Sequence, residues 1–236
     1  MAFDPSKLRV LSFDLDDTLW SGKHVILQAE KAMLDWMKVH TPKILDMYSV
    51  DQLRQQKMQF IKRNSILKNK LSQARQIFLF ELFSEYNYSD AQEKSVACFN
   101  AFYLARQNVT LFSNVLTTLE TLKKHYRLIA ITNGNADIEL TGLGQYFELS
   151  YNAEDFENPK PHSDIFLAAL NQVNIKPSEC LHIGDHPNHD MLGAYQVGMS
   201  TCWLKDGSRA WDQPFKADIE ITHISDLIPG LNINSG

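Results

Sequence analysis

The chain has 236 residues, of which 44% are hydrophobic and 22% charged, and its formal net charge is -5. This composition is typical of a globular protein and argues against a largely disordered chain. No block of Lys and Arg offsets the acidic balance, so the electrostatic pattern of a nucleic-acid-binding protein is missing. The length suits one large domain, or a core domain that carries a smaller insert.

The cysteines and the apolar segments exclude other classes of protein. Cys98, Cys180 and Cys202 form no CxxC pair and no zinc-ligand spacing, and their odd number argues against a disulfide framework. We expect Cys180 and Cys202 to be core residues of strands. The N-terminus lacks the apolar region of a signal peptide, and no stretch is apolar enough to span a membrane. By exclusion, we expect a soluble cytoplasmic protein.

Four short apolar runs without polar alternation are typical of strands that are buried on both faces of a parallel sheet. These runs are Leu8–Phe13, Arg127–Thr132, Cys180–Gly184 and Thr201–Leu204. Helical spacing of apolar residues predicts helices over Ser113–His125 and Ser163–Val173. Strands that alternate with helices indicate βαβ units, and therefore an α/β fold with a doubly wound, mostly parallel sheet.

Residues 21–109 depart from this alternation, because they contain helical runs but no strong strand pattern. We predict an all-helical insert of roughly four helices here, within a core formed by residues 1–20 and 110–236. Two capping-box patterns predict helix starts inside the insert: Ser49 with Gln52, and Ser89 with Gln92.

Three carboxylates follow the first predicted strand directly, at Asp14, Asp16 and Asp17, and Thr18 comes next. In open α/β sheets, ligands bind beyond the carboxyl ends of the strands. Carboxylates crowded there repel one another and are hard to desolvate without a cation. Ligand sets made of oxygen alone favour magnesium over zinc. The segment therefore predicts a magnesium site, with an acidic turn that caps a helix as the simpler alternative.

Two further segments offer groups that can bind a phosphoryl group. Thr132, Asn133 and Gly134 lie at the end of the second predicted strand, and they provide a hydroxyl, an amide and an accessible backbone N–H. Lys160 lies between two prolines, which restrict the backbone and can hold the ammonium group in one place. Taken alone, the first segment also fits an ordinary turn, and the lysine also fits a solvated loop.

Asp185 follows the third predicted strand, and Asp190 comes five residues later. These carboxylates could complete the ligand shell of a magnesium ion. An acidic loop whose Asp caps the N-terminus of a helix would have the same sequence pattern. The four segments together are more informative than each one alone. They supply, in chain order, a nucleophile, hydrogen-bond donors to the phosphate, a positive charge and a metal ligand. These are the parts of a phosphoryl-transfer site.

The order of the motifs DLDDT, ITN, NPKP and GDHPNHD resembles that of the haloacid dehalogenase-like hydrolase superfamily. The resemblance covers the predicted core, and the insert resembles the helical cap of the first type in that superfamily. It implies a catalytic core at 1–20 and 110–236 and a cap at 21–109. The implied activity is that of a magnesium-dependent phosphomonoesterase acting on a small-molecule phosphate.

The same resemblance implies roles for the aspartates of the first motif. Asp14 would attack phosphorus and become an aspartyl-phosphate. Asp16 would protonate the leaving alkoxide and then deprotonate the water that hydrolyses the intermediate. Asp17 has no chemical role in this scheme, and we expect it to make a local turn contact.

The remaining motif residues would bind the metal and the phosphoryl group. Asp14, Asp185 and the backbone carbonyl of Asp16 would ligate Mg²⁺, with Asp190 as direct or indirect support. Thr132, Asn133 and Lys160 would hold the phosphoryl oxygens, and Lys160 would also offset the charge on Asp14.

Other chemically suggestive residues receive simpler interpretations. We expect the histidines of the last motif to have solvent or loop roles rather than metal ligation: His182, His186 and His189. We expect the aromatics of the insert to fill its core, with stacking on a flavin ring as the alternative: Phe78, Phe80, Phe83, Phe99, Phe102 and Tyr103.

Three other functions fit parts of the pattern. A dehalogenase of the same fold needs no acid at the second position, so Asp16 argues against it. A phosphate-receiving signalling domain uses similar residues but is much shorter. A non-catalytic protein on this fold is disfavoured because every catalytic position is filled.

The substrate prediction comes from a narrower resemblance. The segment Ile131–Glu148, with FDLDDTLW and KPHSDIF, is similar to a bacterial group that dephosphorylates flavin mononucleotide and 5-amino-6-(5-phosphoribitylamino)uracil. This implies a ribityl phosphate substrate in the riboflavin pathway, with sugar phosphates or nucleoside monophosphates as the alternative. Trp20, Ser21 and Gly22 lie near the expected hinge to the insert.

Overall fold

Apolar strands build the larger of two units in the computed structural model, which describes residues 3–233. The larger unit comprises Met1–Gly22 and Val109–Gly236, and the smaller one comprises Lys23–Asn108. Their roles as catalytic core and cap stay predictions. No helix among the described residues is long and apolar enough to cross a membrane.

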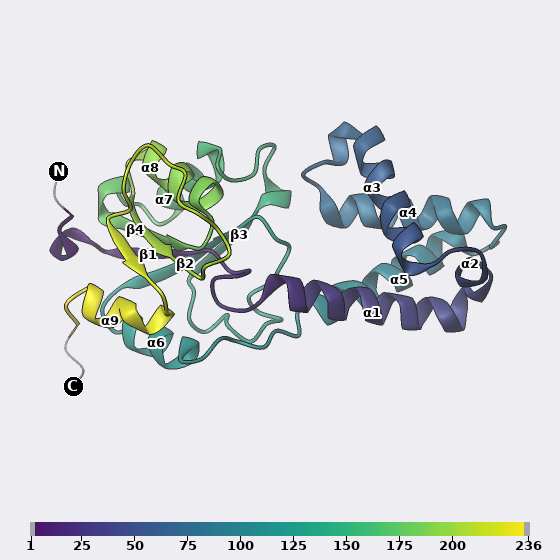
Figure 1. Cartoon of the computed structure of the whole chain (residues 1–236), viewed down its shortest axis with the longest axis horizontal. Coiled ribbons are helices and arrows are strands. Elements are labelled where there is room, and N and C mark those ends of the chain that lie inside the picture. The colour runs from purple at the N-terminus through teal and green to yellow at the C-terminus, as the bar shows by residue number, and fades with distance from the viewer. Residues whose placement is uncertain (1–2, 234–236) are drawn as a thin grey trace. The chain divides into compact units, whose positions relative to one another are not determined.

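A parallel sheet lies at the centre of the larger unit (Figure 1). Its strands run in the order β3-β2-β1-β4-β5-β6, and each neighbouring pair is parallel. The strands are β1 (Val10–Phe13), β2 (Arg127–Thr132), β3 (Leu149–Asn152), β4 (Cys180–Gly184), β5 (Ser200–Leu204) and β6 (Ile219–Ile221). Every residue of β1 and β4 is buried, as expected of central strands that are covered on both faces. The predicted doubly wound α/β fold is confirmed.

The four predicted strands are present, but β3 and β6 were not predicted. Both are short strands at the two edges of the sheet, and the residues of β3 are only half-buried. An edge strand is covered less completely, so its sequence has no continuous apolar run. Cys180 and Cys202 are fully buried in β4 and β5, as predicted.

Helices cover both faces of this sheet. Figure 1 shows α7 (Ser163–Gln172) and α8 (Gly193–Val197) on one face, with α6 (Val115–Leu122) and α9 (Leu227–Gly230) on the other. Ile165, Phe166 and Ala169 of α7 are fully buried against Ile129 and Ile131 of β2. This packing fixes the strand ends from which the motif residues project.

The smaller unit is helical, and its core is formed by apolar side chains of its own helices. The helices are α1 (Gly22–His40), α2 (Pro42–Met47), α3 (Val50–Arg63), α4 (Leu71–Glu85) and α5 (Ala91–Arg106). The sequence predicted roughly four helices, whereas the structure has five in this stretch. The additional boundary lies at Pro42, which starts α2 and cannot continue α1.

One of the two predicted capping boxes is present. Ser49 and Gln52 exchange hydrogen bonds at the start of α3. The second prediction is wrong, because Asp90 rather than Ser89 precedes the first turn of α5. The Asp90 carboxylate accepts a hydrogen bond from Lys94 Nζ at 2.6 Å, one turn further along.

The aromatic side chains of the helical unit lie mainly in its interior. Phe83 and Phe102 are fully buried, and Phe78 and Phe99 pack against the same core. Phe80 is 38% exposed. The core interpretation therefore holds for most of these residues.

Gly193, the first residue of α8, generates a test of the packing around the site. A Cβ atom there would lie 2.5 Å from Cε2 of the buried Phe166 ring and 3.1 Å from the Pro161 backbone. We expect Gly193→Ala to lower the free energy of unfolding by about 1–3 kcal/mol. Gly230→Ala is the matched control, because its Cβ would have ordinary contacts. Urea denaturation of both variants measures the difference, and equal stabilities would contradict the packing described here.

Candidate active site

The carboxyl ends of β1, β2 and β4 bring the sequence motifs together at one edge of the sheet. A pocket at this edge lies within the larger unit. Its lining residues are Asp14, Asp16, Asp17, Thr132, Asn133, Gly134, Lys160, Asp185, His186, His189, Asp190 and Arg209. All seven residues predicted for the site are among them.

The Lys160 ammonium group is the central contact of the pocket. It is buried and donates to three acceptors: Asp14 Oδ1 at 2.7 Å, the Ile131 carbonyl at 2.7 Å and Asp190 Oδ1 at 2.6 Å. An ammonium group has three N–H donors, so each donor has a partner. The prediction that Lys160 offsets the charge on Asp14 agrees with this geometry.

Asn133 positions Lys160 through the backbone. Its Oδ1 accepts from the Lys160 N–H at 2.9 Å, and its Nδ2 donates to the Lys160 carbonyl at 3.0 Å. The side-chain amide, which we expected to hold phosphoryl oxygens, is therefore engaged in holding the lysine. Only one of the two N–H groups of Nδ2 is used in this contact.

Two threonines flank the nucleophile position. Thr132 Oγ1 accepts from the Gly134 N–H at 3.0 Å, so the hydroxyl proton remains a donor for another group. Thr18 Oγ1 donates to Asp14 Oδ2 at 3.3 Å. Together with Lys160, Thr18 holds both oxygens of Asp14, a role that the sequence did not reveal.

Asp16 and Asp17 lie in a tight turn after β1. Trp20 Nε1 donates to Asp16 Oδ1 at 2.8 Å, and Gly22 passes so close that a Cβ there would lie 3.0 Å from the Asp16 side chain. Asp17 has a φ of 61° and accepts from the Gly22 N–H at 2.9 Å. The local turn contact predicted for Asp17 is thus present, and the turn directs Asp16 toward the pocket.

Asp185 has two partners that sequence reasoning missed. Arg209 Nη1, from the loop after β5, donates to Asp185 Oδ2. Trp203 Nε1 of β5 donates to the Asp185 carbonyl at 2.9 Å. The Asp185 side chain is buried whereas that of Arg209 is one-third exposed, so the arginine reaches a buried carboxylate from the solvent side.

Asp190 is held by groups from three elements. Its Oδ2 accepts from the His186 N–H at 3.0 Å, and its Oδ1 contacts Lys160 and, at 3.4 Å, His182 Nε2. His182 Nδ1 lies 2.9 Å from Ser12 Oγ. His182 is fully buried in β4, so the predicted solvent or loop role is wrong for it. It supports Asp190 instead.

The other two histidines line the pocket as a stacked pair. Their ring centroids lie 3.9 Å apart, and His186 Nδ1 accepts from the backbone N–H groups of Asn188 and His189. His186 therefore caps the π-helical turn Pro187–Leu192, which is a loop role.

The charges in the pocket are strongly perturbed. Burial raises the pKa of Asp14 to about 7, against the opposing effect of Lys160. Burial and the nearby Asp190 raise the pKa of Asp185 to about 8. Burial also opposes ionisation of Asp190, but Lys160 and His182 outweigh it and hold that pKa below its ordinary value. The positive charges of Lys160 and Arg209 thus do not offset the burial of Asp14 and Asp185.

The donor set fits a divalent cation. Carboxylate oxygens of Asp14, Asp185 and Asp190 lie within 4.8 Å of one another. Buried carboxylates with raised pKa values are the groups that a hard cation such as Mg²⁺ stabilises. Lys160 and His182 already compensate the charge of Asp190, whereas the pKa values of Asp14 and Asp185 are raised, so Asp14 and Asp185 are the better candidates for direct ligands.

Comparison with known proteins identifies the family of the chain. The model of the haloacid dehalogenase-like hydrolase family matches residues 8–198. The chain belongs to this family. It is 30% identical over 228 residues to the 5-amino-6-(5-phospho-D-ribitylamino)uracil phosphatase YigB of Escherichia coli (strain K12), covering 94% of this chain and 95% of the relative.

Other members of the family are also similar to the chain. It is 30% identical over 239 residues to a glyceraldehyde 3-phosphate phosphatase of Pyrococcus furiosus, covering 98% of this chain and 95% of the relative. A solved structure titled 2-haloacid dehalogenase, from Pseudomonas syringae pv. Tomato DC3000, superposes with a TM-score of 0.88 at 35% identity, over 95% and 98% of the two chains. With its acid pair and its phosphatase relatives, the protein is a phosphatase of this hydrolase family.

The raised pKa values generate a prediction about metal binding. The pKa values of Asp14 and Asp185 in the folded protein lie above those of free carboxyls. Between about pH 4 and 8, the metal-free native state therefore binds more protons than the unfolded state. Its stability consequently falls as the pH rises. Magnesium must displace these protons. We expect its affinity to fall more than about tenfold from about pH 8 to about pH 6.

The shift in melting temperature caused by MgCl₂, relative to NaCl of equal ionic strength, measures this effect. The shift should be larger at the higher pH. Asp185→Asn should show little shift at either pH, because it removes one anionic ligand. An equal shift of the wild type at both pH values would contradict the metal site.

Proposed function

We propose that the protein is a magnesium-dependent phosphomonoesterase that acts through an aspartyl-phosphate on Asp14. The observation that carries this proposal is the fixed Asp14 carboxylate, with Lys160 Nζ at 2.7 Å on one oxygen and Thr18 Oγ1 at 3.3 Å on the other. A nucleophile held in one orientation attacks more readily, because less orientational freedom is lost in the transition state.

Lys160 and Thr132 provide the electrostatic part of the reaction. The ammonium group favours ionised Asp14 and offers positive charge beside the transferring phosphoryl group, and Thr132 can donate its hydroxyl proton to a phosphoryl oxygen. Asp14, Asp185 and the backbone carbonyl of Asp16 would hold magnesium. Bound there, Mg²⁺ supplies the charge that keeps both carboxylates ionised and offsets that of the phosphate.

Asp16 is the general acid and base. In the first step, an Asp14 oxygen forms a bond to phosphorus, the ester P–O bond breaks, and the protonated Asp16 gives its proton to the leaving oxygen. In the second step, Asp16 takes a proton from water, whose oxygen displaces Asp14 and releases inorganic phosphate. The hydrogen bond from Trp20 Nε1 orients the carboxylate for both transfers.

A dehalogenase is the second candidate, because of the solved structure with that title. Halide is a leaving group that needs no proton. Asp16 and the Trp20 contact that holds it therefore favour ester hydrolysis over dehalogenation. Release of halide from a 2-haloacid at a rate comparable to phosphate release from esters would favour the second candidate.

The catalytic assignments predict large losses of activity. Asp14→Asn should abolish phosphate release, because an amide is a far weaker nucleophile. Asp16→Asn should reduce kcat by about 10²–10⁴-fold, the usual contribution of general acid and base catalysis. Asp46→Asn, on the exposed surface of α2, is the control for the charge change and should keep full activity.

Initial rates with a generic phosphate ester measure these effects, with thermal unfolding to verify folding. Chelation of divalent metals should abolish the wild-type activity, and added Mg²⁺ should restore it. Activity of either active-site variant near that of the wild type would overturn the mechanism.

For the substrate, we propose a phosphate monoester on a ribityl chain, such as flavin mononucleotide or 5-amino-6-(5-phosphoribitylamino)uracil. The support is the similarity to YigB over most of both chains and the resemblance across Ile131–Glu148. The phosphoryl pocket binds a group shared by all candidate substrates. Discrimination must therefore come from contacts to the rest of the substrate. We assign that task to the helical unit, as the proposed cap.

A panel of phosphate esters tests this proposal. The value of kcat/KM for the ribityl phosphates should exceed that for sugar phosphates and nucleoside monophosphates by more than about tenfold, or ~1.4 kcal/mol. Glyceraldehyde 3-phosphate belongs in the panel because a relative acts on it. A preference for small sugar phosphates would overturn the substrate proposal and leave the phosphatase assignment intact.

A further inference from the structure

Arg209 is the charged residue of the pocket for which neither the sequence motifs nor the proposed mechanism gives a role. Its Nη1 donates to Asp185 Oδ2, and its side chain is 33% exposed while that of Asp185 is 4% exposed. The carboxylate that we assign to magnesium is thus already paired with a side-chain cation. Arg209 also lines the pocket that contains Thr132 and Lys160.

The loop that carries Arg209 has aromatic contacts only on the side that follows Arg209 among the contacts of residues 206–215. After Arg209, Trp211 Nε1 donates to the Phe215 carbonyl at 2.8 Å, and the Phe215 ring stacks on Tyr195 with centroids 3.9 Å apart. Before Arg209, the loop is exposed, and Gly207 has a φ of 84°. The aromatic contacts therefore fix the loop after Arg209, whereas the exposed part before it is held by the Lys205 backbone bond to Ile221 and by local hydrogen bonds of Ser208 to Asp206.

The two cations of the pocket are held in different ways. Lys160 is buried and donates to three acceptors, so its removal from the site would leave buried groups unsatisfied. Arg209 Nη1 donates to one oxygen of Asp185 and also to Ser208 Oγ at 3.3 Å, and the arginine side chain is one-third exposed. An ion pair that is partly exposed and not bidentate is weak and easily exchanged.

We propose that Arg209 exchanges partners when magnesium binds: the metal displaces it from Asp185, and the guanidinium group then binds the phosphoryl group of the substrate. This inference rests on the magnesium site of the proposed function. Two cations close to one carboxylate repel each other, so the mobile one leaves. A guanidinium group matches the geometry of phosphate oxygens, and the displaced group stays within the phosphoryl pocket.

The competing possibility is that Arg209 orients Asp185 for the metal. The two roles predict opposite signs. If Arg209 competes with magnesium, its removal strengthens magnesium binding. If it orients a ligand, its removal weakens binding. Titration calorimetry with MgCl₂ distinguishes them without relying on activity.

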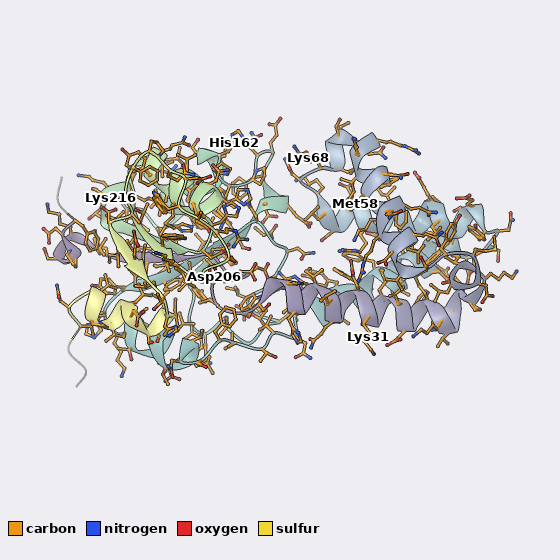
Figure 2. All side chains as sticks on the ribbon, viewed as in Figure 1. Lys31, Met58, Lys68, His162, Asp206 and Lys216 are labelled. Carbon is orange, nitrogen blue, oxygen red and sulfur yellow. The ribbon has the colours of Figure 1, made fainter. Side chains whose placement is uncertain are left out.

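The experiment compares the wild type with Arg209→Gln and with Lys216→Gln. Lys216 is an exposed cation on the same loop as Arg209. Figure 2 shows Lys216 well separated from Asp206, which lies three residues before Arg209 in the loop. We expect Arg209→Gln to bind Mg²⁺ about three- to tenfold more tightly, the size of a weak ion pair, and Lys216→Gln to bind like the wild type. Unchanged or weaker binding by Arg209→Gln would overturn the exchange.

The second step is tested with inorganic phosphate at saturating magnesium. Arg209→Gln should bind phosphate about tenfold more weakly, and Arg209→Lys should recover part of the loss, because it keeps the charge but not the bidentate geometry. Phosphate affinity equal to that of the wild type in both variants would overturn the phosphoryl contact. Absence of magnesium binding to the wild type would instead overturn the metal site itself, and with it this inference.

Discussion

The buried ammonium group of Lys160 is the interaction on which the site depends. An ammonium group removed from water is costly unless each of its donors has a partner. Asp14, Asp190 and the Ile131 carbonyl provide these partners at 2.6–2.7 Å. The three come from the end of β1, the π-helical turn and the end of β2, so one side chain fixes three strand-end segments relative to one another.

The surrounding contacts hold Lys160 and its acceptors in place. Asn133 holds the Lys160 backbone from both sides, and the buried His182 contacts Asp190 from β4 while Ser12 of β1 holds its other nitrogen. Lys160 lies between Asp14 and Asp190, and the two carboxylates differ in how far their ionised forms are stabilised. Asp190 is the one with the lowered pKa, whereas Asp14 stays partly uncompensated. Asp190 is thereby a structural anion, and Asp14 remains available for chemistry.

The sequence predicted those parts of the site that are local in the chain. An apolar run followed by acids marks a strand end, and the parallel topology then brings such ends to one edge. Asn133, His182 and Arg209 depend instead on partners distant in the sequence. Asn133 lies in a motif, but its amide bonds the backbone of Lys160, which is 27 residues away. Arg209 lies in a loop without any pattern, and only the fold brings it to Asp185. The edge strands β3 and β6 were missed for a related reason, since their burial is partial.

The balance of charge decides what chemistry this pocket can perform. Five aspartates line it, with Lys160 and Arg209 as side-chain cations. A phosphate monoester brings further negative charge, so the substrate would be repelled unless a divalent cation entered as well. The raised pKa values of Asp14 and Asp185 express the same excess of negative charge in the metal-free protein. A divalent cation held beside the nucleophile suits a phosphate ester, whose charge that cation can offset. The aspartates therefore support phosphate-ester hydrolysis through the metal that they would hold, in addition to the leaving-group argument from Asp16.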